Sequence, residues 1–165
     1  MSETKVLTPE ELANRAETSD EDAFTAIRVA TLLSRRLQED PERQSWLNDQ
    51  LAGEPSEDLA TIATRALPKD EAVQFAVAAI RACAADPTLR PIVEAAIQEQ
   101  AKAKNLIGTG VLELGIAVSL VLLIAKTEIR KNPETGKWTV IIHPVDNATL
   151  IELAKLGTQA LKLFS

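Results

Sequence analysis

The sequence predicts an α+β protein that is mainly helical. A helical N-terminal region of αα-hairpins should be followed by an apolar segment, a β-hairpin and a closing C-terminal helix. Three observations lead to this prediction. Apolar residues recur at helical spacing through the first hundred residues, punctuated by Pro, Gly and Asp. Hydrophobic residues make up 45% of the chain but aromatics only 3%, so the core depends on helix-favouring Ala and Leu. Near the C-terminus, two β-prone stretches flank a Pro/Gly turn.

Two regions are predicted, residues 1–105 and residues 106–165, with one continuous domain as the alternative. The length of 165 residues suits one domain or two very small ones. The boundary is placed where a polar stretch, Gln98 to Asn105, gives way to an apolar run.

The first helix is expected to open at Thr8 and to run to about Ala16. Thr8 can cap the helix, Pro9 suits its first position, and Glu11 stands where a capping box needs an acid. Ser19-Asp20 should begin the second helix, which the Asp40-Pro41 pair should end, because Pro disfavours helical backbone in the residue before it. Later helices are expected between Pro41 and Gly53, from Ser56 to Pro68, from Lys69 to Asp86, and after Pro87.

A faint internal repeat links two of these helix pairs. Asp40-Pro41 and Asp86-Pro87 are 46 residues apart, and apolar residues follow each pair at matching positions. Each unit is interpreted as helix, turn and helix, which is an αα-hairpin. Two units are too few to indicate a solenoid, and Asp-Pro is also an ordinary helix stop.

The segment from Leu106 to Ala125 allows three interpretations: a buried helix or strand of the fold, a transmembrane helix, or an apolar face covered by an assembly partner. Its 20 residues would be long enough, as a helix, to cross a bilayer. The spacing of Gly115 and Ser119 would allow close helix contact. Glu113 argues against a membrane position, because a charged carboxylate is costly in hydrocarbon.

After this segment, a β-hairpin is expected around the turn at 132–136, and a helix should close the chain. Alternation places four hairpin residues on one buried side: Ile129, Trp138, Val140 and Ile142. Pro144 should end the second strand, and Asp146 or Asn147 should cap the last helix. Gly157 weakens the middle of that amphipathic helix.

Composition and charge exclude several classes of protein. The net charge is −6, from 24 acidic and 18 basic residues, and no basic face is clustered. Aromatic stacking residues are scarce as well, so no nucleic acid partner is expected. Cys83 is the one cysteine, which rules out an intrachain disulfide, and no signal peptide is recognised at the start. Cytoplasmic localisation is therefore expected, with membrane association as the alternative.

The sequence contains no recognisable catalytic, cofactor-binding or metal-binding constellation. His143 and Cys83 cannot build a four-ligand zinc site, and each is interpreted as structural. The stretch from Gly108 to Gly110 resembles a phosphate loop but lacks the third glycine and the Lys-Ser/Thr pair. Acidic pairs lie at helix ends, where those in first turns complement the helix dipole. We therefore expect no enzyme and no cofactor, although an enzyme using carboxylates alone, or half of a shared site, remains an alternative.

Residues 86–90 form the motif Asp-Pro-x-Leu-Arg. An apolar run, a charged strand, a Pro/Gly turn, a second strand and a helix follow it. This layout resembles small effector-associated component domains of bacterial conflict systems. The resemblance covers residues 80–165 and rests on layout. It implies an adaptor that pairs with nucleases, proteases or pore-forming proteins. It carries over no functional residues, and the helical N-terminal half departs from it.

The leading functional hypothesis is a non-catalytic adaptor or assembly module that associates with a protein partner or with itself as a homo-oligomer. It rests on the missing chemistry and on an apolar surface larger than a small fold readily hides. A membrane-inserting effector, using residues 106–125, is the alternative. The expected interface residues are Val111, Leu112, Gly115, Ser119, Leu122, Leu150, Leu153, Leu156 and Leu161.

Overall fold

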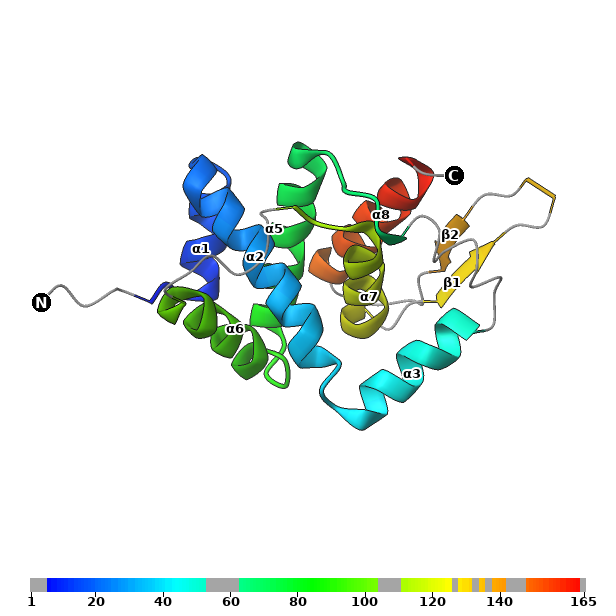
Figure 1. The fold of residues 1–165 in the computed structure, drawn as a ribbon, viewed down its shortest axis with the longest axis horizontal. Coiled ribbons are helices and arrows are strands. Elements are labelled where there is room, and N and C mark those ends of the chain that lie inside the picture. Colours follow the sequence, from blue (N-terminus) through cyan, green and yellow to red (C-terminus); the bar gives the residue numbers. More distant parts are fainter. Residues whose placement is uncertain are drawn as a thin grey trace, which may run out of the picture.

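The structure is a computed structural model that describes residues 6–52, 63–103, 111–125, 128–131, 134–135, 138–141 and 148–163. In these ranges it contains seven helices and two short strands (Figure 1). The helices are α1 (Pro9–Ala16), α2 (Asp20–Leu37), α3 (Pro41–Ala52), α5 (Lys69–Ala85), α6 (Arg90–Lys102), α7 (Leu114–Ala125) and α8 (Ala148–Leu163), and the strands are β1 (Glu128–Lys131) and β2 (Trp138–Ile141).

The predicted mainly helical character is confirmed, but the α+β class, with a β-hairpin as a structural part of the fold, is wrong for the described part of the chain. β1 and β2 have four residues each and pair antiparallel, with Ile129 opposite Val140. α8 contacts β2 and α3 contacts β1, but two strands of four residues each are too short to form a layer of their own. The core is built from helix against helix instead, and the predicted hairpin is not a structural layer of this fold. The four side chains expected on its buried side lie outside the described part.

Local sequence signals explain where the first helices begin. Thr8 Oγ1 accepts a hydrogen bond from Glu11 N at 3.1 Å, and Glu11 Oε1 accepts one from Thr8 N at 3.2 Å. This reciprocal capping box satisfies two backbone N–H groups that a helix end would otherwise leave unpaired. Ser19 caps α2 through Asp22 N. The predicted starts at Thr8 and Ser19 are therefore confirmed, whereas most of the helix predicted from Ser56 lies outside the described residues.

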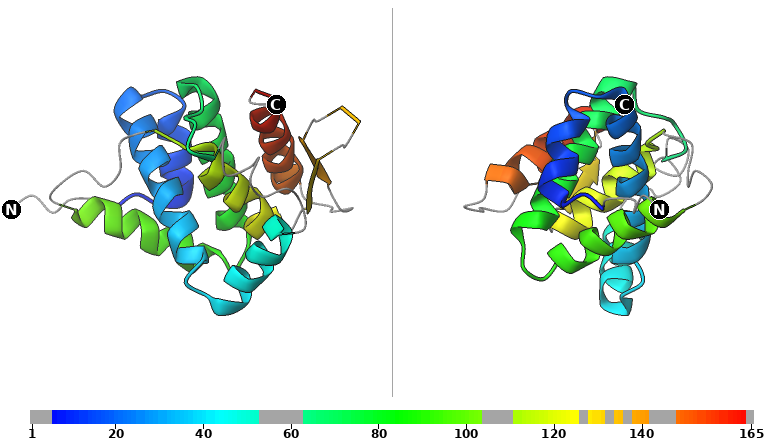
Figure 2. Two further views of the ribbon diagram at one scale, coloured as in Figure 1. Left: turned by 45° about the vertical axis from the view of Figure 1, so that its right-hand side comes forward. Right: turned by 90° about the vertical axis from the view of Figure 1, so that its left-hand side faces the viewer.

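α2 and α5 lie side by side and run in the same direction (Figure 2). At their first residues, Lys69 Nζ is 3.2 Å from Asp20 Oδ1. Just beyond their last turns, Asp40 and Asp86 line one cleft. The two Asp-Pro turns of the faint sequence repeat therefore meet at the same end of the helix pair.

The two repeat units then diverge. α6 turns back and packs on both α5 and α2, so α5 and α6 form a packed helix pair. α3 leaves the end of α2 at a sharp angle and contacts α7 and β1 (Figure 1). Among the described side chains of α3, Leu47 is buried and Trp46 packs partly against the core. These two side chains attach α3 to the helical body in the part of the chain that the structure describes.

α7 occupies the middle of the core. It contacts α2, α3, α5 and α8, and eight of its twelve residues are buried. A helix that is apolar on all sides is stable only when it is covered on all sides, and these neighbours provide that cover. In the described residues, no helix has the length and apolar character that a membrane span needs. Residues on both sides of the predicted boundary at 105–106 contribute to one core cluster.

Two backbone hydrogen bonds hold the chain that enters α7. Leu67 N donates to Leu112 O, and Leu114 N donates to Arg65 O, each at 2.9 Å. They form an isolated antiparallel bridge between Ala66 and Glu113. Glu113 itself is exposed just before the helix begins. Its charge therefore stays in water while the apolar residues that follow it are buried.

Candidate binding cleft

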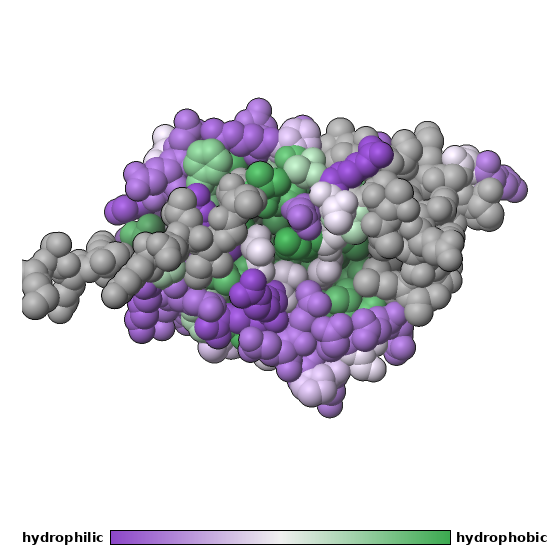
Figure 3. Space-filling view, viewed as in Figure 1, coloured by the Kyte–Doolittle hydropathy of each residue, from purple (hydrophilic) through white to green (hydrophobic). Residues whose placement is uncertain are grey.

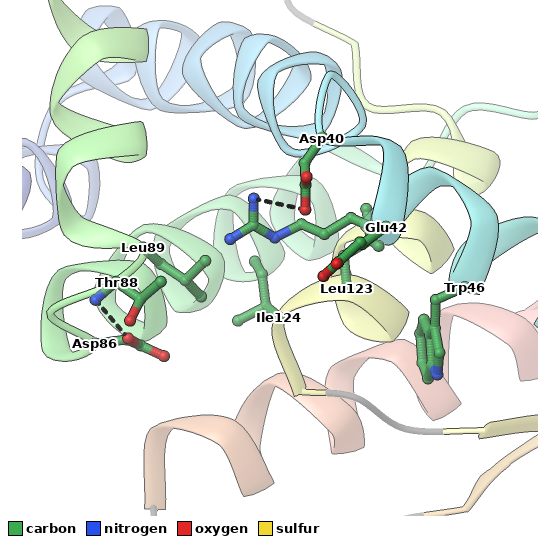
Figure 4. Close-up of a pocket in the computed structure, with 9 residues that line it drawn as sticks. Asp40, Glu42, Trp46, Asp86, Thr88, Leu89, Leu123 and Ile124 are labelled. Carbon is green, nitrogen blue, oxygen red and sulfur yellow. Dashed lines mark hydrogen bonds and ion pairs between the residues drawn. The ribbon is translucent and has the colours of Figure 1, made fainter.

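A cleft of about 490 Å³ opens where α3, the turn between α5 and α6, and the end of α7 meet (Figure 4). Ligand sites in proteins commonly have volumes of about 300–1,000 Å³. The residues that line it are Asp40, Glu42, Arg43, Trp46, Asp86, Thr88, Leu89, Leu123 and Ile124. Three elements distant in sequence therefore contribute to one concave surface.

The floor of the cleft is apolar. Leu89, Leu123 and Ile124 are 5–6% exposed, so each belongs to the core and shows only an edge to the cleft. Trp46 projects from α3 at one edge of the cleft, on the side away from Leu89 and Asp86, and is only partly buried (Figure 4). A partly covered tryptophan at the edge of an apolar floor combines a large contact area with little freedom to lose on binding.

The rim of the cleft is charged. Arg43 Nη1 lies 3.6 Å from Asp40 Oδ2. Asp86 Oδ1 accepts a hydrogen bond from Thr88 N at 2.8 Å, which fixes this carboxylate in its turn. Glu42 is exposed and has no basic partner in the described part of the chain. In the part of the chain that the structure describes, the rim therefore carries three carboxylates and one guanidinium group.

A second groove, of about 520 Å³, runs along α5 from Lys69 to Arg81, beside the end of α1 and the first turns of α2 and α8. Its two basic side chains are engaged within the fold. Lys69 pairs with Asp20, and Arg81 Nη1 lies 2.9 Å from Glu17 Oε1. The apolar positions facing it are mostly nearly buried alanines and Val77. This groove lacks an exposed aromatic anchor, so the cleft at Trp46 is the stronger candidate.

The described residues offer little for catalysis. Cys83 is fully buried, and desolvation raises the pKa of its thiol to about 12, so it is protonated and protected at neutral pH. Within the described ranges, no three His, Cys, Asp or Glu side chains are grouped to hold a metal ion. His143 and the stretch from Gly108 to Gly110 lie outside the described residues.

Most of the residues predicted at an interface lie inside the fold. Leu112, Leu122, Leu153 and Leu161 are buried, while Leu150 and Leu156 are partly buried against the same core. Gly115 and Ser119 are partly exposed, and Val111 is 43% exposed. Hydrophobic residues show in the middle of the face of Figure 1, between hydrophilic borders (Figure 3). Contact of any of these nine residues with a partner stays a prediction.

Sequence reasoning missed the cleft, although one signal pointed to it. The repeat marked Asp40 and Asp86 as equivalent positions, but spacing does not reveal that α2 and α5 run in parallel. Only that arrangement brings both turns to one end of the molecule and sets Trp46 across from them.

Comparison of the chain with protein-family models, with curated proteins and with solved structures finds no match in any of the three. The cleft therefore has to be interpreted from its own geometry.

Proposed function

We propose that this protein is a non-catalytic adaptor that binds a segment of a protein partner in the cleft at Trp46. The observation behind the proposal is a partly exposed Trp46 at the edge of a cleft that has an apolar floor and a charged rim. Protein interfaces concentrate their binding energy in such aromatic anchors, which a polar rim surrounds.

The chemistry of the lining favours binding over catalysis. In the described residues, no His, Cys, Lys or Ser side chain lines the cleft, and its candidate acid–base groups are carboxylates. The carboxylates of Asp40 and Asp86 are each held by a neighbour in the fold. The membrane and carboxylate-enzyme alternatives have no comparable support in the described residues.

The size of the cleft sets an expectation for affinity. Stable protein complexes bury well over 1,000 Å² of surface, and smaller contacts are typically transient. A cleft of about 490 Å³ can hold a few side chains of a partner. We therefore expect a dissociation constant on the order of 10 μM for the isolated contact, with tighter binding only if further surfaces join.

Site-specific photo-crosslinking tests the proposal. A photoreactive amino acid is placed at Thr88, an exposed residue in the cleft, and at Lys155 as an exposed control on α8. We expect a defined protein to crosslink from Thr88 and not from Lys155. The crosslinked protein is then purified and its affinity for the chain measured by calorimetry.

Two variants decide whether the cleft is responsible. Trp46→Ala removes the anchor, and Thr88→Arg fills the cleft from an exposed position without touching the core. Both should weaken the purified complex at least tenfold, whereas Lys155→Ala should not change it. Unchanged affinity in folded Trp46→Ala and Thr88→Arg, or equal crosslinking from both positions, would refute the proposal.

A further inference from the structure

We infer that the segment bound in the cleft is short and carries a Lys or Arg side chain next to a bulky apolar one. This inference rests on the proposed function and specifies the chemistry of the partner. The apolar side chain would lie on Leu89, Leu123 and Ile124, and the cation would face the carboxylates of the rim.

The charge balance of the rim selects a cation. Among the described residues, Asp40, Glu42 and Asp86 line the cleft as acids and Arg43 is the one basic residue beside them. Arg43 is directed to Asp40, so it leaves the other two carboxylates without a cation in the described part of the chain. The chain as a whole carries −6, which adds long-range attraction for a basic segment.

The two turns hold their carboxylates ready for binding. Asp86 uses one oxygen to accept the Thr88 N–H bond, and a carboxylate has acceptor positions left after a single bond. Asp40 is held by Arg43 in the equivalent turn. A guanidinium or ammonium group therefore meets the Asp86 carboxylate in a position that is already fixed, which lowers the entropy lost on binding.

Trp46 suits the same occupant. The aliphatic stem of Lys or Arg can lie on an aromatic ring while its charged head stays near the polar rim. Trp46 is on α3, one turn after Glu42, so both residues reach the cleft from the same helix. One basic side chain could then contact the ring and a carboxylate together.

The acidic residue at position 42 can also be explained by its place in the helix, and this explanation calls for a control variant. Glu42 lies in the first turn of α3, where the helix dipole favours an acid whether or not a ligand binds. Its replacement could therefore weaken α3 without acting on a partner. Asp49, exposed on the same helix and outside the cleft, provides a variant with the same change in charge.

Two labelled peptides test the inference by fluorescence anisotropy. Both repeat the unit Ser, Leu and a charged residue. The charged residue is Arg in one peptide and Glu in the other. We expect the intact protein to bind the Arg peptide in the micromolar range and the Glu peptide at least tenfold more weakly. Glu42→Lys should weaken binding of the Arg peptide at least fivefold, whereas Asp49→Lys should weaken it less than twofold. Higher salt should weaken binding of the Arg peptide to the intact protein. Circular dichroism of both variants checks that they keep their helices.

The outcomes separate this inference from the proposed function. Equal binding of both peptides, lost in Trp46→Ala, would overturn the charge preference and leave the cleft as a binding site. Binding of neither peptide, or an equal loss in Glu42→Lys and Asp49→Lys, would overturn the inference, while the crosslinking result stands separately. Sedimentation that shows self-association weakened only by Glu42→Lys would replace the basic partner with a second copy of the chain.

Discussion

A Cβ atom added to Gly157 would lie 2.7 Å from Cγ2 of Val121. Gly157, in the middle of α8, therefore lets α8 pack closely against Val121 of α7. Its cost in helix propensity is offset by the packing that it permits between the two helices.

Gly157→Ala should destabilise the protein by about 1–3 kcal/mol, because Val121 has a short, stiff side chain that cannot move aside cheaply. Helix propensity alone would stabilise the variant by about 1 kcal/mol, so the sign of the change is diagnostic. Urea unfolding measures it. Val121→Ala in the same background should recover part of the loss, and a Gly157→Ala variant more stable than the parent would show that the helices are not in contact here.

Leu120→Ala should cost about 2–5 kcal/mol of stability, because Leu120 is fully buried in α7. Val111→Ala should change stability by about 0.5 kcal/mol or less, since Val111 is 43% exposed. Thermal and denaturant unfolding of the two variants compares them directly. Similar small losses at both positions would contradict a buried α7 and favour the assembly interpretation of residues 106–125.

Cys83 should resist thiol reagents in the native protein and react quickly after unfolding. Burial raises its pKa from 9.0 to about 12, so the unfolded chain loses the thiol proton first. The associated stability is present below pH 9 and falls as pH rises from about 9 towards 12. Ellman's reagent at pH 8, with and without guanidinium, measures the protection.

Cys83→Ala should remove the part of the alkaline stability loss that comes from the thiol, in a comparison of unfolding at pH 8 and pH 10. An unchanged pH dependence in this variant, or rapid labelling of the native protein, would place the thiol outside the core.

Glu10 should support the attachment of α1 in a pH-dependent way. Hydrogen bonds from Arg90 hold the pKa of Glu10 below its ordinary value of 4.5, and Arg90 Nη2 lies 3.2 Å from Glu10 Oε2. A lowered pKa contributes stability above about pH 4.5 that is lost as the pH falls further. Both groups are largely exposed, so the effect should be small and screened by salt.

Glu10→Gln should therefore flatten the loss of stability between pH 5 and pH 3, measured by thermal unfolding. Glu21→Gln, an exposed acid in the first turn of α2, is the control and should leave that slope nearly unchanged. Equal slopes in both variants would show that the Arg90 pair adds nothing to stability.

The helix boundaries were predictable because their causes are local. A capping box at Thr8, a cap at Ser19 and the Asp-Pro pairs act within one turn of helix, so they are visible in the sequence itself. The α+β class was wrong for the opposite reason. Two β-prone stretches can be recognised locally, but whether they form a layer depends on their length and on the surfaces around them.

A mainly helical chain, the starts of its first helices and its acidic charge could be predicted from local sequence. The tertiary structure was needed to show that α7 is covered by four neighbours, that most of the predicted interface leucines lie in the core, and that Gly157 serves helix packing. It also brought Trp46, Asp40 and Asp86 to one cleft. Local signals act over one or two turns, whereas a cleft depends on the relative direction of helices that are distant in the chain, and periodicity carries no information about that direction.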